Sequence, residues 1–320
     1  MRTTRLAVVL LAISLTACHS GTRSHPDSSH RVASLPNRIG RLQGTPIDRR
    51  IGKMNADHAQ LIRFAIETVP KPLPREATPF VQFLADEGDS RHGIIKTPPN
   101  GKLRNHYVVA APGSNTLQFN LVCLRNFEQV ACAPSVRVWQ VSLSPLTMVE
   151  APIEFAVHEG DRLDFLVLIK GDLVRPFPAS QDSHVAVGVR RKPASTLEAP
   201  RHDAVLGGCD LATIQADAAR HKSFRPPGEQ PLSRPLFLIV QPPCDSNKNP
   251  RGEVIRVVGV VDRTNVVVFP GLESPLRIIA PAVVEHIPHL VSLRSGSELQ
   301  IVVFRERLPA WITHPVKFVA

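Results

Sequence analysis

The chain has 320 residues, of which 43% are hydrophobic and 21% are charged. This composition is typical of folded proteins and excludes wholesale disorder, and the length suffices for about two domains of roughly 100–200 residues each. Proline is abundant at 30 residues, aromatic residues make up only 5%, and the formal net charge is +10; so many prolines argue against a helical bundle or a long coiled coil.

The first residues have the pattern of an export signal. Met1 to Arg5 carries two arginines, and Leu6 to Leu15 is a ten-residue apolar run. A membrane-spanning helix needs about 20 apolar residues, so this run is too short to span a bilayer. A basic start, a short apolar segment and small residues after it are typical of a signal peptide, which we place at residues 1–17.

The end of this segment, Leu15-Thr16-Ala17-Cys18, resembles the lipobox of bacterial lipoproteins. The resemblance covers residues 1–20 and implies cleavage before Cys18, a diacylglyceryl group on its sulfur, and a fatty acyl chain such as palmitate on its amino group. Two or three lipid chains anchor a protein almost irreversibly. In enteric bacteria an aspartate directly after the lipidated cysteine would imply retention at the inner membrane. This chain has His19 at that position, which implies the outer membrane. The alternative is a secreted protein with a chance cysteine near its cleavage site.

Residues 18–53 are expected to form a lipidated tether, because they are rich in Ser, Arg, Gly, Pro and His and lack sustained periodicity. This segment has seven basic residues, and its only acidic residues are Asp27 and Asp48. A basic tether would lie against anionic lipid headgroups or other envelope polyanions. A solvated spacer is the alternative interpretation.

The segment 55–68 is the clearest predicted helix, because Asn55 can cap it and apolar residues such as Leu61 and Ile62 recur at helical spacing. From about residue 78 the periodicity changes to two, which indicates strands. We predict strands at 79–85, 105–111, 116–124, 136–143, 153–158, 162–170 and 184–190. After a linker at 191–235, with a short helix over 210–222, we predict strands near 236–241, 253–261, 264–269, 276–280, 289–293, 298–304 and 315–319.

Short strands at this spacing, without long crossover helices, predict a mainly β chain of tandem β-sandwich domains of Ig-like type, with one or two short helices. The first domain, with its helix, is expected over residues 54–190 and the second over residues 236–320.

The two β regions resemble each other in sequence. Gly160 aligns with Gly296, and the alternating residues Leu163, Phe165 and Val167 then align with Leu299, Ile301 and Val303. After a one-residue gap, Val149-Glu150 aligns with Val284-Glu285. Glycine permits a positive φ in a tight turn. A true tandem repeat and two independent hairpins of similar composition are the alternatives.

Without Cys18, four cysteines remain, and an even number in an exported protein indicates disulfides. Of the three connectivities we prefer Cys123–Cys132 and Cys209–Cys244, because each pair is nearest in sequence. Four buried free thiols are the alternative.

No standard catalytic motif is present, and no cofactor is expected. The tightest histidine cluster is Glu285-His286-Ile287-Pro288-His289. Pro288 would break a helix that presents both rings, and a third ligand such as His314 would have to come from elsewhere. We therefore treat His286 and His289 as weak metal candidates and expect turn or surface histidines.

Aromatic residues give little support to a sugar or nucleic-acid site. Trp139 lies inside an alternating strand and is expected in the core. No interleaving of aromatic and basic residues indicates a stacking groove, and an exported, lipid-anchored protein is a poor partner for nucleic acid.

These features predict a protein anchored to the outer membrane through Cys18 that binds or scaffolds envelope proteins without catalysis, for example in a secretion or surface-appendage system. A second hypothesis is an immunity or inhibitor lipoprotein, because basic charge favours capture of an acidic active-site cleft. A third is an envelope hydrolase, which requires His286, His289 and Asp245 to converge in one pocket. The oligomeric state is left open.

Overall fold

Strands with one apolar face form the first β-sandwich. The structure is a computed structural model, and it describes residues 34–54, 56–67, 80–84, 93–111, 116–170, 180–189, 197–198, 229–232, 236–240, 252–278, 282–287, 293–305, 310–313 and 315–320. One layer is a seven-stranded sheet in the order β1 (Ile39–Gln43), β8 (Val138–Leu143), β6 (Leu117–Arg125), β10 (Arg162–Lys170), β11 (Ser180–Val187), β4 (Ile94–Ile95), with β7 (Glu128–Val130) beside β6. The other is a four-stranded sheet in the order β2 (Thr45–Pro46), β9 (Thr147–Ala156), β5 (Lys102–Ala111), β3 (Phe80–Leu84).

Large side chains fill the space between these two sheets. Tyr107 and Phe165 are fully buried, with their ring centroids 5.1 Å apart. Trp139 is buried as predicted, and its indole Nε1–H donates to the carbonyl of Pro152 in the opposite sheet at 2.9 Å. A buried indole N–H needs such an acceptor, so Trp139 fixes one sheet against the other.

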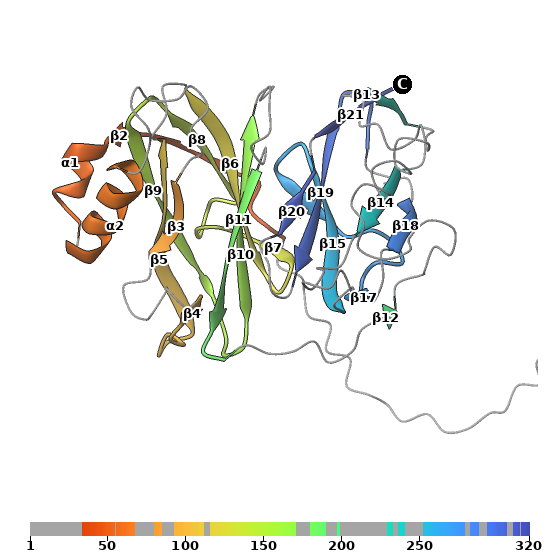
Figure 1. Cartoon of the computed structure of the whole chain (residues 1–320), viewed down its shortest axis with the longest axis horizontal. Helices are drawn as coiled ribbons and strands as arrows, with labels where there is room; N and C mark the ends of the chain where they lie inside the picture. Colours follow the sequence, from red (N-terminus) through yellow and green to blue (C-terminus); the bar gives the residue numbers. More distant parts are fainter. Residues whose placement is uncertain are drawn as a thin grey trace, which may run out of the picture. The chain divides into compact units, whose positions relative to one another are not determined.

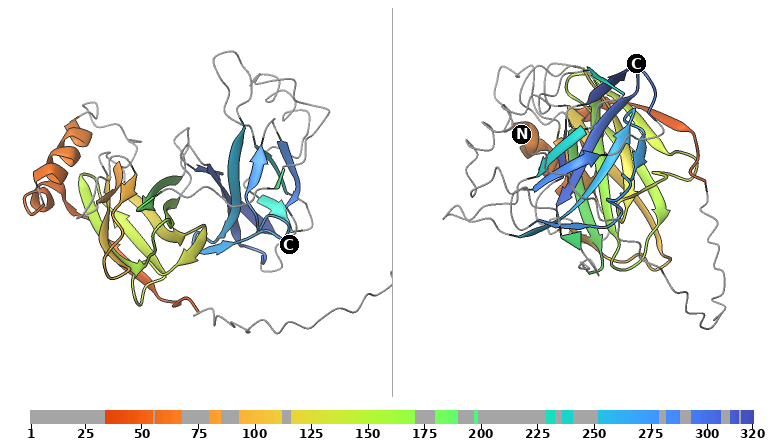
Figure 2. Two further views of the ribbon diagram at one scale, coloured as in Figure 1. Left: turned by 90° about the horizontal axis from the view of Figure 1, so that it is seen from below. Right: turned by 90° about the vertical axis from the view of Figure 1, so that its right-hand side faces the viewer.

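Two helices cover part of the outer face of the four-stranded sheet (Figures 1 and 2). They are α1 (Ile47–Ile51) and α2 (Ala56–Glu67), and α2 confirms the helix predicted at 55–68. Ile62 is fully buried in a cluster with Val108, Ala110 and Met148 of the sheet. Phe64, two residues further along α2, is 67% exposed.

The second β-sandwich repeats the architecture of the first. Its large sheet has eight strands, in the order β12 (Leu197–Glu198), β17 (Leu276–Ile278), β15 (Glu253–Val261), β19 (Glu298–Arg305), β21 (Val316–Val319), β13 (Glu229–Pro231), with β16 (Asn265–Val267) beside β15 and β20 (Trp311–Ile312) beside β19. A two-stranded sheet pairs β14 (Leu236–Val240) with β18 (Ala282–Ile287). The described residues are thus mainly β and form two β-sandwiches and two short helices, as the sequence predicts.

Apart from the additional strand β20 of the second, the two large sheets have the same strand topology. β6 and β10 are the antiparallel central pair of the first sheet, and β15 and β19 are that of the second. In both sheets a short edge strand from earlier in the chain joins in parallel, β1 on β8 and β12 on β17. At the opposite edges β4 joins β11 and β13 joins β21, again in parallel. The order in which strands pair is therefore repeated from the first large sheet to the second, in agreement with the sequence alignment.

Several boundaries differ from the prediction. Residues 39–51 were expected inside the tether of 18–53, but they form β1, β2 and α1 of the first sandwich. Likewise, β12 and β13 lie in the predicted linker 191–235 and belong to the second sheet. The physical reason is that these strands are very short or lie at sheet edges, so they carry no alternating pattern. In the second sandwich β18 occupies residues 282–287, where no strand was predicted. The strand predicted at 289–293, apart from Leu293, and the helix predicted over 210–222 lie outside the described residues.

From Leu35 to Ala320 the described residues make one compact unit. None of the described helices is long and apolar enough to cross a membrane.

Candidate functional site

The aligned glycines Gly160 and Gly296 occupy the same turn in the two sandwiches. Both have a positive φ, 85° and 90°. The N–H of Gly160 donates to the carbonyl of Val187 at 2.7 Å, and that of Gly296 donates to the carbonyl of Phe318, also at 2.7 Å. Only glycine adopts this conformation without strain, so the alignment of these two residues is confirmed by geometry.

The residues that directly follow β6 and β15, at the same strand ends as these glycine turns, also correspond. Asn126 and Asp262 have φ of 52° and 50°. Their N–H groups donate to the carbonyls of Arg162 and Glu298, each at 2.8 Å. Their side-chain oxygens accept from the N–H of the same two residues, at 3.0 and 2.9 Å. Asn and Asp tolerate the left-handed conformation better than other non-glycine residues.

The central strands are buried on both faces, because the two sandwiches pack against each other through them. All residues from Leu163 to Ile169 are buried, as are those from Leu299 to Phe304. Alternate residues face the core of their own sandwich, and the others form a shared apolar cluster that we call the seam. Its buried members are Val122, Leu124, Val138, Leu166 and Leu168 of the first sandwich and Val258, Val260, Val302, Phe304 and Ile312 of the second.

The seam joins corresponding faces. Val122 and Val258 stand 136 positions apart in the chain, and so do Leu166 and Val302. An interface that uses the same patch from both partners is isologous, the arrangement of a two-fold homodimer. Here both partners belong to one chain.

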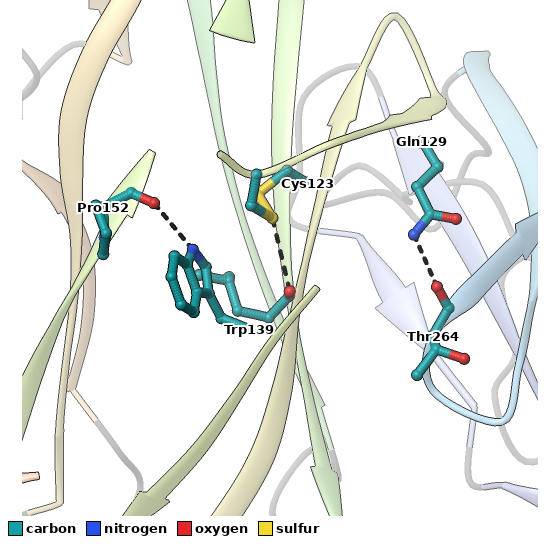
Figure 3. Close-up of a disulfide and its surroundings, with 7 residues drawn as sticks. Cys123, Gln129, Trp139, Pro152 and Thr264 are labelled. Carbon is teal, nitrogen blue, oxygen red and sulfur yellow. Dashed lines mark hydrogen bonds between the residues drawn. A yellow bond between two sulfur atoms is a disulfide. The ribbon is translucent and has the colours of Figure 1, made fainter. Parts of the chain in front are cut away.

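Polar groups fix the register of the seam. Gln129 of β7 donates through Nε2 to the carbonyl of Thr264 at 2.7 Å (Figure 3). Its Oε1 accepts from the N–H of Val266 at 3.0 Å. The Asn120 Nδ2 donates to the carbonyl of Arg263 at 2.9 Å. These bonds are directional, whereas apolar burial is not, so they set which residues face each other.

Two buried carboxylates lie at what we call the first end of the seam. Asp164 is fully buried and accepts from the guanidinium of Arg162, at 2.8 Å from Nη2 and 3.0 Å from Nε. Glu253 is 3% exposed and accepts from Arg305 Nη2 at 2.7 Å. Arg162 Nη1 also donates to the carbonyl of Arg305, at 3.2 Å. The two ion pairs therefore form one network across the seam.

Aromatic rings enclose the same network. The guanidinium of Arg162 lies over the rings of Phe127 and Phe304, 5.1 and 5.7 Å from their centroids, within the range of a cation–π contact. Burial raises the pKa of the Asp164 carboxyl above its ordinary value, and the charge and hydrogen bonds of Arg162 oppose that rise. Because both carboxylates are held by arginines inside the seam, they act as structural groups that join the sandwiches.

The cysteine pair predicted in the first domain is present. Cys123 and Cys132 form a disulfide, with their Cα atoms 5.4 Å apart, and both are fully buried (Figure 3). The bond links Cys132, two residues after the end of β7, to Cys123 of β6, and both lie in the core of the first sandwich. Cys209 and Cys244 lie outside the described residues, as does Cys18.

Of the histidines and the aspartate named for the weak metal candidate and the hydrolase hypothesis, only His286 falls in the described part of the chain. His286 lies in β18, while His289, His314 and Asp245 fall outside the described residues. Among the residues that the structure describes, no three His, Cys, Asp or Glu side chains gather in a group suited to a metal ion.

No protein-family model matches this chain, and none of the curated proteins matches it. Among solved structures, it is similar to the crystal structure of red sea bream transglutaminase, with a TM-score of 0.21 and 11% sequence identity. The match covers 84% of this chain and 34% of that one, so the chain spans about a third of the length of that enzyme. So distant a likeness carries nothing about function.

Sequence reasoning did not find the seam. The signal was present, because β10 and β19 carry apolar residues on both faces, Leu166 and Leu168 in the first and Val302 and Phe304 in the second. A strand covered on both sides has such a continuous apolar run.

Proposed function

We propose that this chain is an outer-membrane lipoprotein that binds or scaffolds other envelope proteins without catalysis. Support for the anchor comes from the lipobox-like segment ending at Cys18. Support for a scaffolding role comes from the seam, because it joins two β-sandwiches through apolar burial, two buried ion pairs and the hydrogen bonds of Gln129. Such a body holds its outer faces in a fixed relation, which is what a scaffold between two partners requires.

The observation that carries the non-catalytic part is the placement of Asp164 and Glu253. Buried carboxylates are the residues that most often serve as general acids or bases when they face a cleft. Here each is held by an arginine at 2.7–2.8 Å within the seam. The proposed work of the protein therefore lies on its outer faces and sheet edges, where short strands such as β1 and β12 lie.

The anchor is tested by fractionation of cells that express the full chain or its Cys18→Ala variant. We expect the unmodified chain in the outer-membrane fraction and the variant in the soluble fraction. Ser34→Ala is the control, because it changes one exposed residue, leaves the disulfide intact and should stay with the membrane. Equal membrane association of the chain and Cys18→Ala would overturn the anchor.

The scaffolding role is tested by crosslinking in intact envelopes, followed by purification of the chain. We expect envelope assembly proteins at a fixed ratio to the chain. Recovery of a single exported toxic enzyme, together with loss of its activity on adding the purified chain, would instead establish the inhibitor hypothesis. Hydrolysis of envelope material by the purified chain alone would overturn the non-catalytic assignment.

A further inference from the structure

The two ends of the seam correspond in position but differ in charge. At the first end, the cations Arg162 and Arg305 pair with Asp164 and Glu253. The opposite end, which we call the cationic end, is defined by Arg41, Lys170, Arg263 and Glu298. By the 136-residue correspondence, Arg263 replaces Phe127, and Glu298 replaces Arg162.

Sheet register places the cations of the first sandwich on one strip. Arg41 pairs with Gln140, Gln140 with Asn120, and Asn120 with Leu168, so these four residues form one row across the sheet. Lys170 lies two residues beyond Leu168 on β10 and therefore faces the same side.

Arg263 reaches this strip from the second sandwich. Its carbonyl accepts from Asn120 at 2.9 Å, which fixes its backbone over the row. Its Nη2 contacts Glu298 at 2.8 Å, and its side chain is only 15% exposed. Its Nε is buried and makes no hydrogen bond in the described part of the chain.

Arg263 and Arg41 are both close enough to Lys170 for their positive charges to act on it. Burial lowers the pKa of the Lys170 ammonium, and the positive charges of Arg263 and Arg41 lower it further, while Glu298 opposes them. Among the described residues at this end, the three cations Arg41, Lys170 and Arg263 thus have one carboxylate, that of Glu298, to balance them. Arg41 is exposed, whereas Lys170 and Arg263 are partly buried. Partly buried like charges cost stability unless a counter-charge is supplied.

We propose that the cationic end of the seam binds a phosphate-type anion. The arginine fork fits phosphate oxygens in a bidentate way, and a lysine ammonium adds a point charge. The side chain of Gln140, which lies between Arg41 and Asn120 in the row and is half-buried, supplies a neutral donor. The phosphate can belong to a lipid headgroup or be free in solution.

The test uses the full chain with Cys18→Ala, so that no lipid anchor contributes to binding. Two probes separate the sources of phosphate: inorganic phosphate in a calorimetric titration, and flotation with phosphatidylcholine vesicles with or without phosphatidylglycerol. The site variant adds Arg41→Gln and Lys170→Gln. The control adds Lys96→Gln and Arg277→Gln, which remove the same charge at exposed positions.

We expect binding of at least one probe, weakened about tenfold or more in the site variant and unchanged in the control. Binding of free phosphate would assign a soluble ligand, and binding of the anionic vesicles alone would assign a headgroup. Equal weakening in both variants, or no binding of either probe, would overturn the proposal.

Thermal unfolding supplies a second readout. Without an anion, the site variant should melt at the same temperature as the parent or higher, because like charges have been removed. The ligand that binds should raise the melting temperature of the parent and not of the site variant. A lower melting temperature of the site variant, with no ligand-dependent shift in either protein, would show that the cations are only structural.

Discussion

Phe269 packs against Gly259 in the second sandwich, in the places that Cys132 and Cys123 hold in the first. Gly259 pairs with Val267 as Cys123 pairs with Val130, and Phe269 and Cys132 each follow two residues later. A Cβ on Gly259 would lie 2.9 Å from the ring of Phe269, which is fully buried. One sandwich thus uses a covalent bond where the other uses a ring over a glycine.

This relationship predicts that Gly259→Ala destabilises the protein by about 1–3 kcal/mol, because the new methyl group overpacks a filled core. The free energy of unfolding, measured by denaturant titration, checks it. Gly52→Ala is the control, since Gly52 has an α-helical φ of −63° and a Cβ there would meet only the carbonyl of Asp48 at 3.7 Å. Equal stability of the Gly259→Ala variant and the parent would contradict the packing described.

Removal of the disulfide by Cys123→Ala with Cys132→Ala should cost about 2–3 kcal/mol, the chain-entropy value for a short loop. The two cysteines are nine residues apart. Denaturant unfolding with and without a reducing agent provides the measurement, and the reductant should affect the double variant less than the parent.

The ion pair in the seam gives a prediction with a pH dependence. Arg162→Met leaves the Asp164 carboxylate buried without its partner and should cost about 3–5 kcal/mol near pH 8. Burial raises the pKa of Asp164 in the folded state, so the native protein holds this proton more tightly than the unfolded chain does. Protonation therefore favours the native state, and that contribution is lost as pH rises through the folded-state pKa.

In the variant the pKa of Asp164 rises further, because Arg162 no longer opposes the effect of burial. Its stability deficit relative to the parent should therefore shrink from pH 8 to pH 5, as measured by denaturant unfolding at each pH. Arg162→Met with Asp164→Leu should recover much of the loss at pH 8. A deficit that grows on acidification would contradict the assignment.

Two apolar residues of α2, two positions apart, have opposite environments: Ile62 is buried and Phe64 is exposed. Ile62→Ala should cost about 2–5 kcal/mol, because Ile62 is fully buried against the four-stranded sheet. Phe64→Ser should change stability by less than about 0.5 kcal/mol, because that ring is 67% exposed. Thermal melts of the two variants measure both, and similar losses would show that α2 is oriented differently.

The central strands of both sandwiches could be predicted from the sequence. The strand predicted at 162–170 is β10, and the strand predicted at 253–261 is β15. The pairing of Cys123 with Cys132 followed from their closeness in sequence, and the match of Gly160 with Gly296 followed from the alternation after each. These signals are local, and alternation or a short spacing is enough to reveal them.

The seam and the edge strands could not be predicted in this way. The two-residue strands β2, β4, β12 and β20 have too few residues for any period, and their pairing depends on sheets built from distant segments. The contact of Asn120 with Arg263 joins residues 143 positions apart. Only the fold reveals which of two apolar strand faces lies in a core and which lies in the seam.

Burial of the central strands on both faces has a consequence for the order of synthesis. Whether the chain emerges from a ribosome or from an export channel, the first sandwich comes out before β15 and β19. Until those strands follow, nothing covers its seam residues Val122, Leu124, Leu166 and Leu168. Exposed apolar surface on a partly made protein is prone to aggregation. The newly made chain therefore passes through a stage in which a folding helper that shields apolar strands would be most useful, and that stage closes when residues 253–305 arrive.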